Sequence, residues 1–217
     1  QVAVRYQIPL VFYAEHGESE YGGRVLSEEH LKIRDIAEIL ENQVGDDPRN
    51  WVSDEVSDLD LAPYTLPSTQ ELNAVGVKAM YYAYFFPWDV FQNYKMISEV
   101  MDFRTAPAGR TDGTFTDYDS LDDKVDDLYY HLQYIKFGFG RATRDASRLI
   151  QRGHITREEG LESAYKYDAE FPYSHLPDLL DYLNTDEPAL YRAIDLHRNE
   201  ELWVQEGNEW RLRYPPL

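Results

Sequence analysis

The stretch "IPLVFYA" at residues 8–14 is a nearly continuous apolar run that ends at Glu15. Such a run is typical of a strand that is buried on both faces, as in a parallel sheet. A second apolar run occupies residues 78–86, includes "MYYAYFF", and ends at Pro87. Helical patterns lie between the two runs, and parallel strands need a crossover of this kind. The sequence therefore predicts an α/β fold that contains two neighbouring parallel strands.

The segment between the two predicted strands contains two predicted helices. The first covers residues 26–40, "LSEEHLKIRDIAEIL", which begin with an N-cap serine and carry an apolar face. Residues 43–67 contain three prolines and many acids, and we interpret them as a surface insertion. Ser68 and Glu71 then form a capping box, which predicts a short helix that Gly76 can end.

The later part of the chain has mainly helical patterns. We expect residues 1–103 to form half of a parallel α/β domain, and residues 104–217 to form a helical extension. A capping box at Thr156 and Glu159 marks the start of one of these helices. The helices predicted in the extension cover residues 125–135, 142–152, 157–167, 176–184 and 187–198.

Composition excludes several functional classes. The 217 residues include 21 Lys and Arg against 40 Asp and Glu, so the formal net charge is −19. A basic face for nucleic acid or for an anionic membrane is therefore not expected. No apolar run approaches the ~18 residues that a membrane span needs, and the absence of cysteine excludes disulfides and thiolate metal sites. We expect a cytoplasmic globular protein without nucleic-acid or membrane partners.

Basic residues of this acidic chain are concentrated in residues 134–150, "YIKFGFGRATRDASRLI". The three arginines of this segment and Arg152, just after it, are separated by three, four and four residues. On a helix this spacing places side chains along one face. The arginines that share this predicted face are Arg141, Arg144, Arg148 and Arg152.

Lys136, Gly138 and Gly140 lie directly before these arginines. Glycine lets a backbone approach a ligand closely, and the N–H groups at the start of a helix favour phosphate. The pattern therefore indicates a phosphate or pyrophosphate site. The alternative is that the arginines pair with the acids upstream of them, which would make the stripe structural. Those acids are Asp117, Asp119, Asp122, Asp123, Asp126 and Asp127.

A second group of candidate residues follows the two predicted strands. Glu15, Tyr21 and Gly22 follow the first strand, and Trp88 and Asp89 follow the second. Open parallel sheets bind ligands at the carboxyl ends of their strands, so these residues are candidates for nucleotide or sugar contacts. In the alternative interpretation, the glycine forms a turn and the aspartate caps the next helix. The six histidines have no ligand-like spacing, and no metal site is predicted from them.

Four segments resemble the later part of the N-acetyl sugar amidotransferases, enzymes of surface-polysaccharide and nonulosonic acid pathways. They are "IPLVFYAEHGESEYGG", "YYAYFFPWD", "YIKFGFGRATRDASRLIQRGHITREEGL" and "LHRNEELWVQEGNEWRLR". The most specific part is "KFGFGRATRDAS" with the later "GHITREEG". The resemblance implies an ATP pyrophosphatase-type α/β fold (adenine nucleotide α-hydrolase-like), related to those of GMP synthetase and asparagine synthetase. Residues 1–103 would then be the C-terminal half of a Rossmann-like nucleotide-binding domain, and residues 104–217 the helical extension that carries "KFGFGR".

The resemblance also implies a reaction and its participants. ATP, with Mg²⁺, would activate the oxygen of a sugar-linked acetamido group as an adenylate, and ammonia would displace AMP to leave an acetamidino group. A glutaminase subunit and a cyclase-like subunit would supply the ammonia. Lys136 and Arg141 would contact the leaving pyrophosphate or the diphosphate of a sugar nucleotide. Gly138, Gly140 and Arg144 would complete that site, which belongs to a pathway such as O-antigen synthesis.

The chain departs from this family in one important motif. The phosphate-binding loop of the family, Ser-Gly-Gly-x-Asp-Ser, is not present in these 217 residues, and neither are the cysteines of the same region. Because the chain also starts at Gln1 in the middle of a pattern, we expect a portion of a longer enzyme that is inactive alone. The alternative is a non-catalytic binding or assembly subunit that retains the later half of the family.

Overall fold

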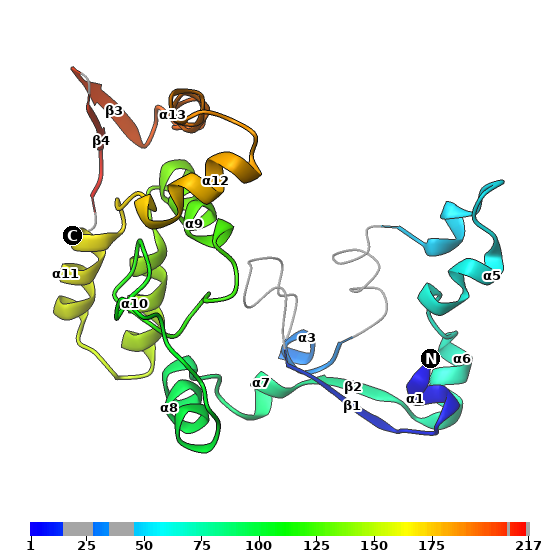
Figure 1. Cartoon of the computed structure of the whole chain (residues 1–217). Coiled ribbons are helices and arrows are strands. Elements are labelled where there is room, and N and C mark those ends of the chain that lie inside the picture. Colours follow the sequence, from blue (N-terminus) through cyan, green and yellow to red (C-terminus); the bar gives the residue numbers. More distant parts are fainter. Residues whose placement is uncertain (15–27, 35–45, 208, 216–217) are drawn as a thin grey trace. The chain divides into compact units, whose positions relative to one another are not determined.

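The computed structural model describes residues 1–14, 28–34, 46–207 and 209–215. The chain forms two compact units, Gln1–Trp88 and Asp89–Leu217, which are described separately below (Figure 1). The division predicted after residue 103 falls inside the second of these units.

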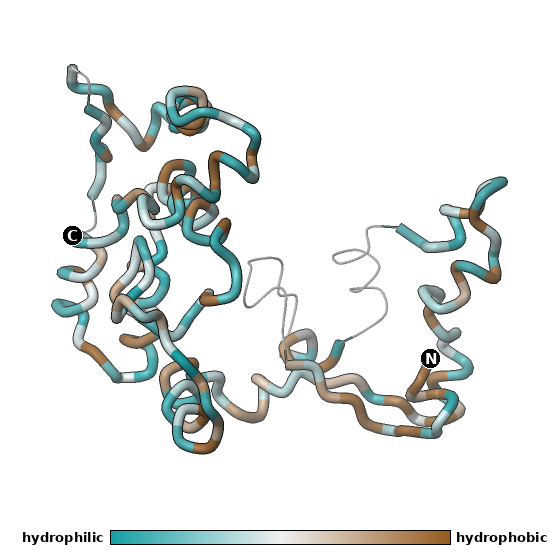
Figure 2. Tube along the Cα trace, viewed as in Figure 1, coloured by the Kyte–Doolittle hydropathy of each residue, from teal (hydrophilic) through white to brown (hydrophobic). Residues whose placement is uncertain are grey.

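The first unit contains the predicted pair of parallel strands. Strand β1 (Leu10–Tyr13) pairs in parallel with β2 (Lys78–Tyr81), and Leu10 lies opposite Lys78 in the register. Hydrophobic residues run along both strands (Figure 2), but the side chain of Phe12 is 48% exposed. The expectation of a β1 strand buried on both faces is therefore wrong for the described residues, which contribute two strands to this sheet. A larger ATP pyrophosphatase-type sheet stays a prediction.

The second apolar run is a strand over only half of its predicted length. Strand β2 ends at the fully buried Tyr81, and helix α7 (Tyr82–Phe85) follows. Residues three apart on a helix share a face. Accordingly, Tyr82 and Phe85 both contact Phe12 edge-on, with ring centroids 5.9 and 6.0 Å away. A continuing strand would have put these two rings on opposite faces, so aromatic packing accounts for the difference.

Helix α6 (Thr69–Val75) begins and ends where the sequence predicts. Ser68 and Glu71 form the expected capping box, and Gly76 ends the helix in the left-handed region at φ 73°. Of the predicted helix at residues 26–40, the structure describes only a part, and the rest lies outside the described residues. The remaining elements of this unit are α1 (Val2–Arg5), α3 (Glu28–Lys32), η2 (Pro48–Trp51), α5 (Asp58–Leu61) and η3 (Ala62–Tyr64).

The second unit is mainly helical, as expected for the later part of the chain (Figure 1). Each helix that the sequence predicts after residue 103 is present, and the Thr156–Glu159 capping box starts α11. No helix of the described part is long and apolar enough to cross a membrane. The helices are α8 (Val90–Val100), α9 (Val125–Phe137), α10 (Arg141–Gln151), α11 (Arg157–Tyr167), η4 (Tyr173–His175), α12 (Leu176–Tyr182) and α13 (Glu187–Asp195).

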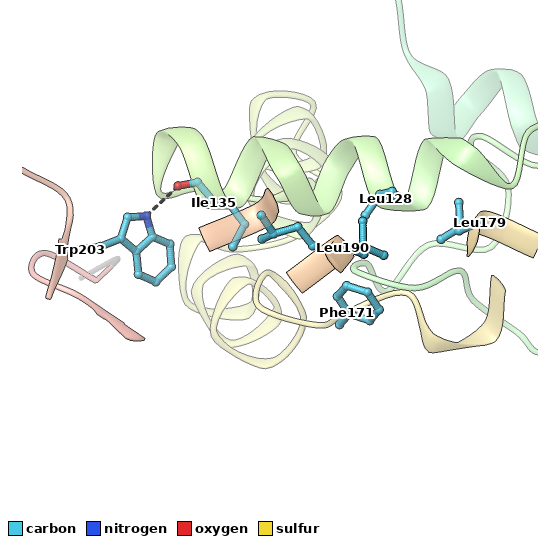
Figure 3. Close-up of a cluster of buried hydrophobic side chains, with 7 residues drawn as sticks. Leu128, Ile135, Phe171, Leu179, Leu190 and Trp203 are labelled. Atoms are coloured by element: carbon cyan, nitrogen blue, oxygen red, sulfur yellow. Dashed lines mark hydrogen bonds between the residues drawn. The ribbon is translucent and has the colours of Figure 1, made fainter. Parts of the chain in front are cut away.

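The hydrophobic core of the second unit forms around one side of α9 (Figure 3). The Trp203 indole N–H donates to the backbone oxygen of Ile135 at 2.7 Å, which satisfies a buried polar group. This hydrogen bond joins the end of the chain to α9. The core cluster consists of Leu128, Ile135, Phe171, Leu179, Leu190, Ile194 and Trp203.

A hairpin near the C-terminus was not predicted. Strands β3 (Trp203–Glu206) and β4 (Glu209–Leu212) pair antiparallel, with Trp203 opposite Leu212. The alternation of Trp210 and Leu212 with polar residues and a glycine-containing turn are the signals that could have found it. The Arg198 guanidinium lies 4.5 Å from the Trp203 ring and 5.4 Å from the Trp210 ring.

Candidate functional site

The corner between α9 and α10 contains the two glycines that the sequence singled out. Gly138 ends α9 in the left-handed region at φ 78°, and its N–H donates to the Tyr134 oxygen at 2.8 Å. This conformation favours glycine because a side chain would be strained there. A Cβ at this position would also lie 3.3 Å from Leu212 Cδ2. Gly138 therefore has a clear structural role in ending the helix.

Gly140 permits a close approach, and the group that approaches it is a carboxylate of the chain itself. A Cβ at Gly140 would lie 2.8 Å from Asp168 Oδ1 and 2.9 Å from the Asp168 backbone oxygen. The same carboxylate accepts the Thr143 N–H at 2.9 Å and the Thr143 hydroxyl. A carboxylate is favoured at the start of a helix, where N–H groups are unpaired. In this structure Asp168 takes the place at the start of α10 that the sequence suggested for a phosphate.

Arg141 is buried and paired. Its side chain is 0% exposed, its Nη1 donates to Asp127 Oδ1 at 2.8 Å, and its Nη2 donates to the Asp119 backbone oxygen at 2.6 Å. Its guanidinium also lies 4.8 Å from the centroid of the Tyr130 ring. Pairing with the upstream acids, which the sequence left open as an alternative, is thus observed for Arg141. A contact of Arg141 with pyrophosphate stays a prediction.

Arg144, one turn further along α10, pairs with two carboxylates. It donates to Asp119 Oδ2 and to Asp145 Oδ1, the latter at 2.9 Å, and its guanidinium lies 4.3 Å from the Tyr130 ring. Burial opposes the charged form, but Asp145 and Asp119 outweigh it and raise the pKa of the Arg144 guanidinium. The Tyr130 ring therefore lies within 5 Å of the guanidiniums of the buried Arg141 and the half-buried Arg144, while Arg148 is exposed.

The carboxylates of this group have further partners from distant parts of the unit. Asp145 Oδ2 accepts the hydroxyls of Thr114 at 2.6 Å and Thr116 at 3.1 Å. Asp127 Oδ2 lies 2.9 Å from His175 Nδ1. Burial raises the pKa of Asp127, and Arg141 and His175 act in the opposite direction. We call this connected set the arginine cluster: Asp119, Asp127, Tyr130, Arg141, Arg144, Asp145 and His175.

Lys136 differs from Arg141 in being exposed. It lies at the end of α9, and its ammonium is 5.8 Å from the centroid of the Phe137 ring. The rings of Phe137 and Phe139 stack on each other 6.2 Å apart and are themselves exposed. A cation beside two exposed rings can bind an anionic ligand that has a planar or apolar part. Of the two candidate catalytic residues, Lys136 alone is open to solvent in this structure.

The candidate residues from the strand ends are described only in part. Asp89 caps α8 by accepting the Gln92 N–H at 3.0 Å, and its other oxygen lies 2.8 Å from His154 Nε2. The capping alternative is thus observed for Asp89. Trp88 is exposed and belongs to the first unit. The three other candidates, Glu15, Tyr21 and Gly22, lie outside the described residues, so a site at these strand ends stays a prediction.

The arginine cluster falls within the part of the chain that resembles known proteins. Residues 112–214 match a family model described as LPS biosynthesis protein WbpG-like, C-terminal domain. A comparison with curated proteins found no significant match. The matched region begins just after Thr111 and extends through the C-terminal hairpin. The match supports a role in LPS biosynthesis.

We next compare the described residues with the needs of a metal ion and of a triphosphate. Among the described residues, no group of three or more His, Asp or Glu side chains is arranged to hold a metal ion. The start of α10, the candidate phosphate site, is capped by Asp168. The described residues therefore do not themselves form a cradle for a triphosphate with its Mg²⁺.

Sequence reasoning missed two further residues of the matched region, Asp168 and His175. Asp168 caps α10 through Thr143, which lies 25 residues earlier in the chain, and His175 pairs with Asp127 across 48 residues. No local pattern signals contacts over such separations. The same is true of Arg110 and Glu170, which are joined by two hydrogen bonds of 2.6 Å.

Proposed function

We propose that this chain is part of an ATP-dependent amidotransferase that converts an N-acetyl group of a sugar or sugar nucleotide into an acetamidino group during LPS biosynthesis. The observation that carries the proposal is the match of residues 112–214 to an LPS biosynthesis family. The segment "KFGFGRATRDAS", which resembles the amidotransferases most specifically, lies inside that match.

The proposed reaction has two steps. In the first, the acetamido oxygen attacks the α-phosphorus of ATP and pyrophosphate leaves. In the second, ammonia adds to the carbon of the resulting adenylate, the C–O bond breaks, and AMP leaves. Because an amide oxygen is a poor nucleophile, catalysis relies on positioning and on neutralising the charge of the phosphates.

Lys136 supplies the exposed positive charge in this proposal. Its ammonium beside the Phe137 ring, which stacks on Phe139, would bind the diphosphate of the sugar nucleotide or the leaving pyrophosphate. The buried Arg141 and the half-buried Arg144 would act indirectly, by holding the acids of the arginine cluster in place. These are positioning roles, because neither guanidinium is exposed as Lys136 is.

ATP and Mg²⁺ are assigned to the Ser-Gly-Gly-x-Asp-Ser loop, which the resembling family carries and these 217 residues do not contain. The described residues do not fit that role, so we derive no step through the metal. Ammonia would come from a glutaminase subunit together with a cyclase-like subunit, as the resemblance implies. Both would be partners of the complete enzyme.

The test uses the complete protein that contains this chain, purified from its native host. It is incubated with ATP, Mg²⁺, ammonium chloride and an N-acetylated nucleotide sugar, and the products are analysed by mass spectrometry. We expect a product in which an NH group replaces one oxygen, together with equal amounts of AMP and pyrophosphate. Hydrolysis of ATP to ADP, or no change in the sugar, would contradict the proposal.

A matched pair of lysine variants tests the site. Lys136→Ala should abolish amidine formation, because the ammonium near the phosphates is lost. Lys166→Ala is the control, since Lys166 is also exposed and its ammonium lies 5.0 Å from the Tyr167 ring. Equal activity of the two variants would show that Lys136 is not part of the site.

The second candidate function is a non-catalytic binding or assembly subunit. The observation that favours it is the lack of a Ser-Gly-Gly-x-Asp-Ser sequence in this chain. In that case the protein as made by its host would bind a glutaminase or sugar-nucleotide enzyme without forming AMP. Co-purification from the native host, followed by the AMP assay, distinguishes the two functions.

A further inference from the structure

The connection between α8 and α9, residues 101–124, contains no helix or strand of its own (Figure 1). Connections of more than about 15 residues without secondary structure are uncommon in compact units, and many of them are functional loops. None of these residues belongs to the hydrophobic core of Figure 3, and the two buried side chains, Thr114 and Thr116, are polar. Hydrophobic burial therefore does little to hold this connection against the helices.

An ion pair fastens one end of residues 110–119, a segment that we call the strap. Arg110 and Glu170 form two hydrogen bonds of 2.6 Å, and the Gly113 N–H donates to the same carboxylate at 2.9 Å. The Arg110 and Glu170 side chains are 33% and 29% exposed, so water and salt reach the pair. An ion pair in this environment can break and re-form without exposing apolar surface.

The remaining contacts of the strap with α10 are polar as well. The Thr114 and Thr116 hydroxyls donate to Asp145, and the Asp119 carboxylate accepts from Arg144. Each of these groups can exchange its protein partner for water, and the net contribution of such a hydrogen bond is small. Segments with few buried apolar contacts are the ones that open locally while the rest of a protein stays folded.

The strap is also braced by bonds within the connection itself. The Thr111 N–H donates to the Thr116 backbone oxygen at 3.2 Å, and the Ala106 N–H donates to the Asp117 backbone oxygen at 2.7 Å. These bonds do not depend on the helices, so they persist when the contacts with α10 break. The strap can therefore move as one piece.

The two ends of the strap have the features of hinges. Gly109 precedes it at φ 79° with no atom near its Cβ position, and Ser120 follows it at φ 54°, a value that is uncommon for a residue other than glycine. A few residues at the ends of a segment absorb the backbone rotation of a moving loop. Beside Ser120, Tyr118 stacks on Tyr94 of α8 at 4.5 Å, but α8 contributes no residue to the core.

We propose that the strap is a lid that opens and closes on the folded protein, and that the Arg110–Glu170 pair is its latch. In the closed state of this structure, the strap covers Asp145 and one edge of Arg144. When the strap opens, both side chains reach solvent while the core around α9 stays folded. The strap then controls access to this side of α10, and its opening does not depend on the proposed reaction.

Hydrogen exchange of the complete protein, followed by mass spectrometry, tests the opening. Peptides from the strap are compared with peptides from residues 128–137 of α9, at several low concentrations of urea. We expect strap amides to exchange at least about 10-fold faster than α9 amides and with little dependence on urea, as in local opening. Strap amides that exchange at the rate of α9 and with the same urea dependence would overturn the proposal.

A matched pair of glutamate variants tests the latch. Glu170→Gln removes the charge that holds Arg110, so strap exchange should become about 10-fold faster, the effect of losing a charge-assisted hydrogen bond. Glu206→Gln is the control, because Glu206 pairs with Arg211 in the C-terminal hairpin at 3.3 Å, away from the strap. In both variants α9 should exchange as in the wild type. If the strap and α9 become faster together in Glu170→Gln, the pair stabilises the whole fold and is not a latch.

Salt provides a test that needs no variant to fold. Raising NaCl from about 0.1 M to about 1 M shortens the Debye length from about 10 Å to about 3 Å and weakens exposed ion pairs. Strap exchange in the wild type should become faster, and the effect should be smaller in Glu170→Gln, where the charge pair is already lost. Salt effects of equal size in the two proteins would contradict the role of the latch.

Reaction with phenylglyoxal, an arginine reagent, tests what the strap covers. Modification of Arg144 should be about 10-fold faster in Glu170→Gln than in the wild type, in step with the exchange rates. Arg148 is the internal control, because it is exposed on the same helix and should react equally in both. An unchanged rate at Arg144 would show that the strap does not control its access. None of these measurements uses ATP or a sugar, so their outcome is separate from that of the amidine assay.

Discussion

Arg141 and Arg148 belong to the same stripe of arginines but lie in opposite environments. Arg141 is buried against Asp127, and Arg148 is exposed near the end of the same helix. Arg141→Met leaves a buried carboxylate without its cation, so we expect a loss of about 3–5 kcal/mol in the free energy of unfolding. Arg148→Met, the matched control, should change it by less than about 0.5 kcal/mol. Urea unfolding of both variants is the measurement, and similar small losses would contradict the buried pair.

His131 makes the stability of the protein depend on pH. Burial lowers the pKa of His131 to about 4, from 6.5. The unfolded chain therefore binds a proton between these two values that the folded protein does not, and stability falls as the pH decreases from about 6.5 to about 4. Within that window, His131 makes the free energy of unfolding change by up to about 1.4 kcal/mol per pH unit.

The His131→Gln variant isolates this contribution. Because glutamine does not titrate, the loss of unfolding free energy between pH 6.5 and 4 should be smaller than in the wild type, by as much as about 3 kcal/mol. Chemical denaturation at several pH values measures the difference. Equal slopes in the two proteins would show that the folded protein protonates His131 normally.

At the level of the elements, the junction between α9 and α10 depends on the contact of Gly140 with Asp168. Gly140→Ala places a methyl group against the Asp168 carboxylate and backbone, at distances under 3 Å. We expect a destabilisation of about 1–3 kcal/mol from this overpacking, with loss of the cap on α10. Gly153→Ala is the control, because it meets nothing within 4 Å and strains only the backbone, at φ 72°. Its cost should be about 1 kcal/mol.

Thermal unfolding followed by circular dichroism compares the two glycine variants. A Gly140→Ala protein as stable as the wild type would mean that Asp168 is free to move away from the helix. The start of α10 would then be open to a phosphate after all, as the sequence first suggested.

The sequence predicted the elements that have local signals. The capping boxes at Ser68 and Thr156 start helices as expected, and apolar spacing located α9. Residues 82–85 were assigned to a strand because an apolar run without alternation does not distinguish strand from helix. Contacts with Phe12, distant in the sequence, select the helical turn there.

The candidate site was predictable only in part. Charge and spacing identified the arginines, and the acids upstream were named as their alternative partners. Which arginine is buried depends on the packing of α10 against its neighbours, and that is not encoded in the spacing. The pairing of His175 with Asp127 could not be predicted at all, because the two residues are 48 positions apart and only the fold brings them together.

At the level of the whole molecule, the two units differ in how many of their described hydrophobic side chains are buried. Residues 89–217 contain a connected core around α9, whereas the described part of residues 1–88 has a two-stranded parallel sheet with exposed aromatic residues. A sheet of two strands is marginal by itself. We therefore expect a fragment of residues 89–217 to fold and to unfold cooperatively in urea, with a helical circular dichroism spectrum. A fragment of residues 1–88 should show no cooperative transition.

Cooperative unfolding of both fragments would contradict this account of the first unit. Unfolding of residues 89–217 without a cooperative transition would contradict the account of the core in Figure 3. Either result would also change the interpretation of the variants above, since all of them lie in the second unit.

The most direct test of the proposed amidotransferase function follows the oxygen of the acetamido group. A nucleotide sugar with ¹⁸O in its acetamido carbonyl is incubated with the complete enzyme, ATP, Mg²⁺ and ammonium chloride. The products are then separated, and their masses are measured by mass spectrometry. Activation of the oxygen as an adenylate predicts that the label appears in the phosphate of AMP and that the sugar product carries nitrogen in its place. Label that stays in the sugar, or that appears in inorganic phosphate, would contradict the proposed function.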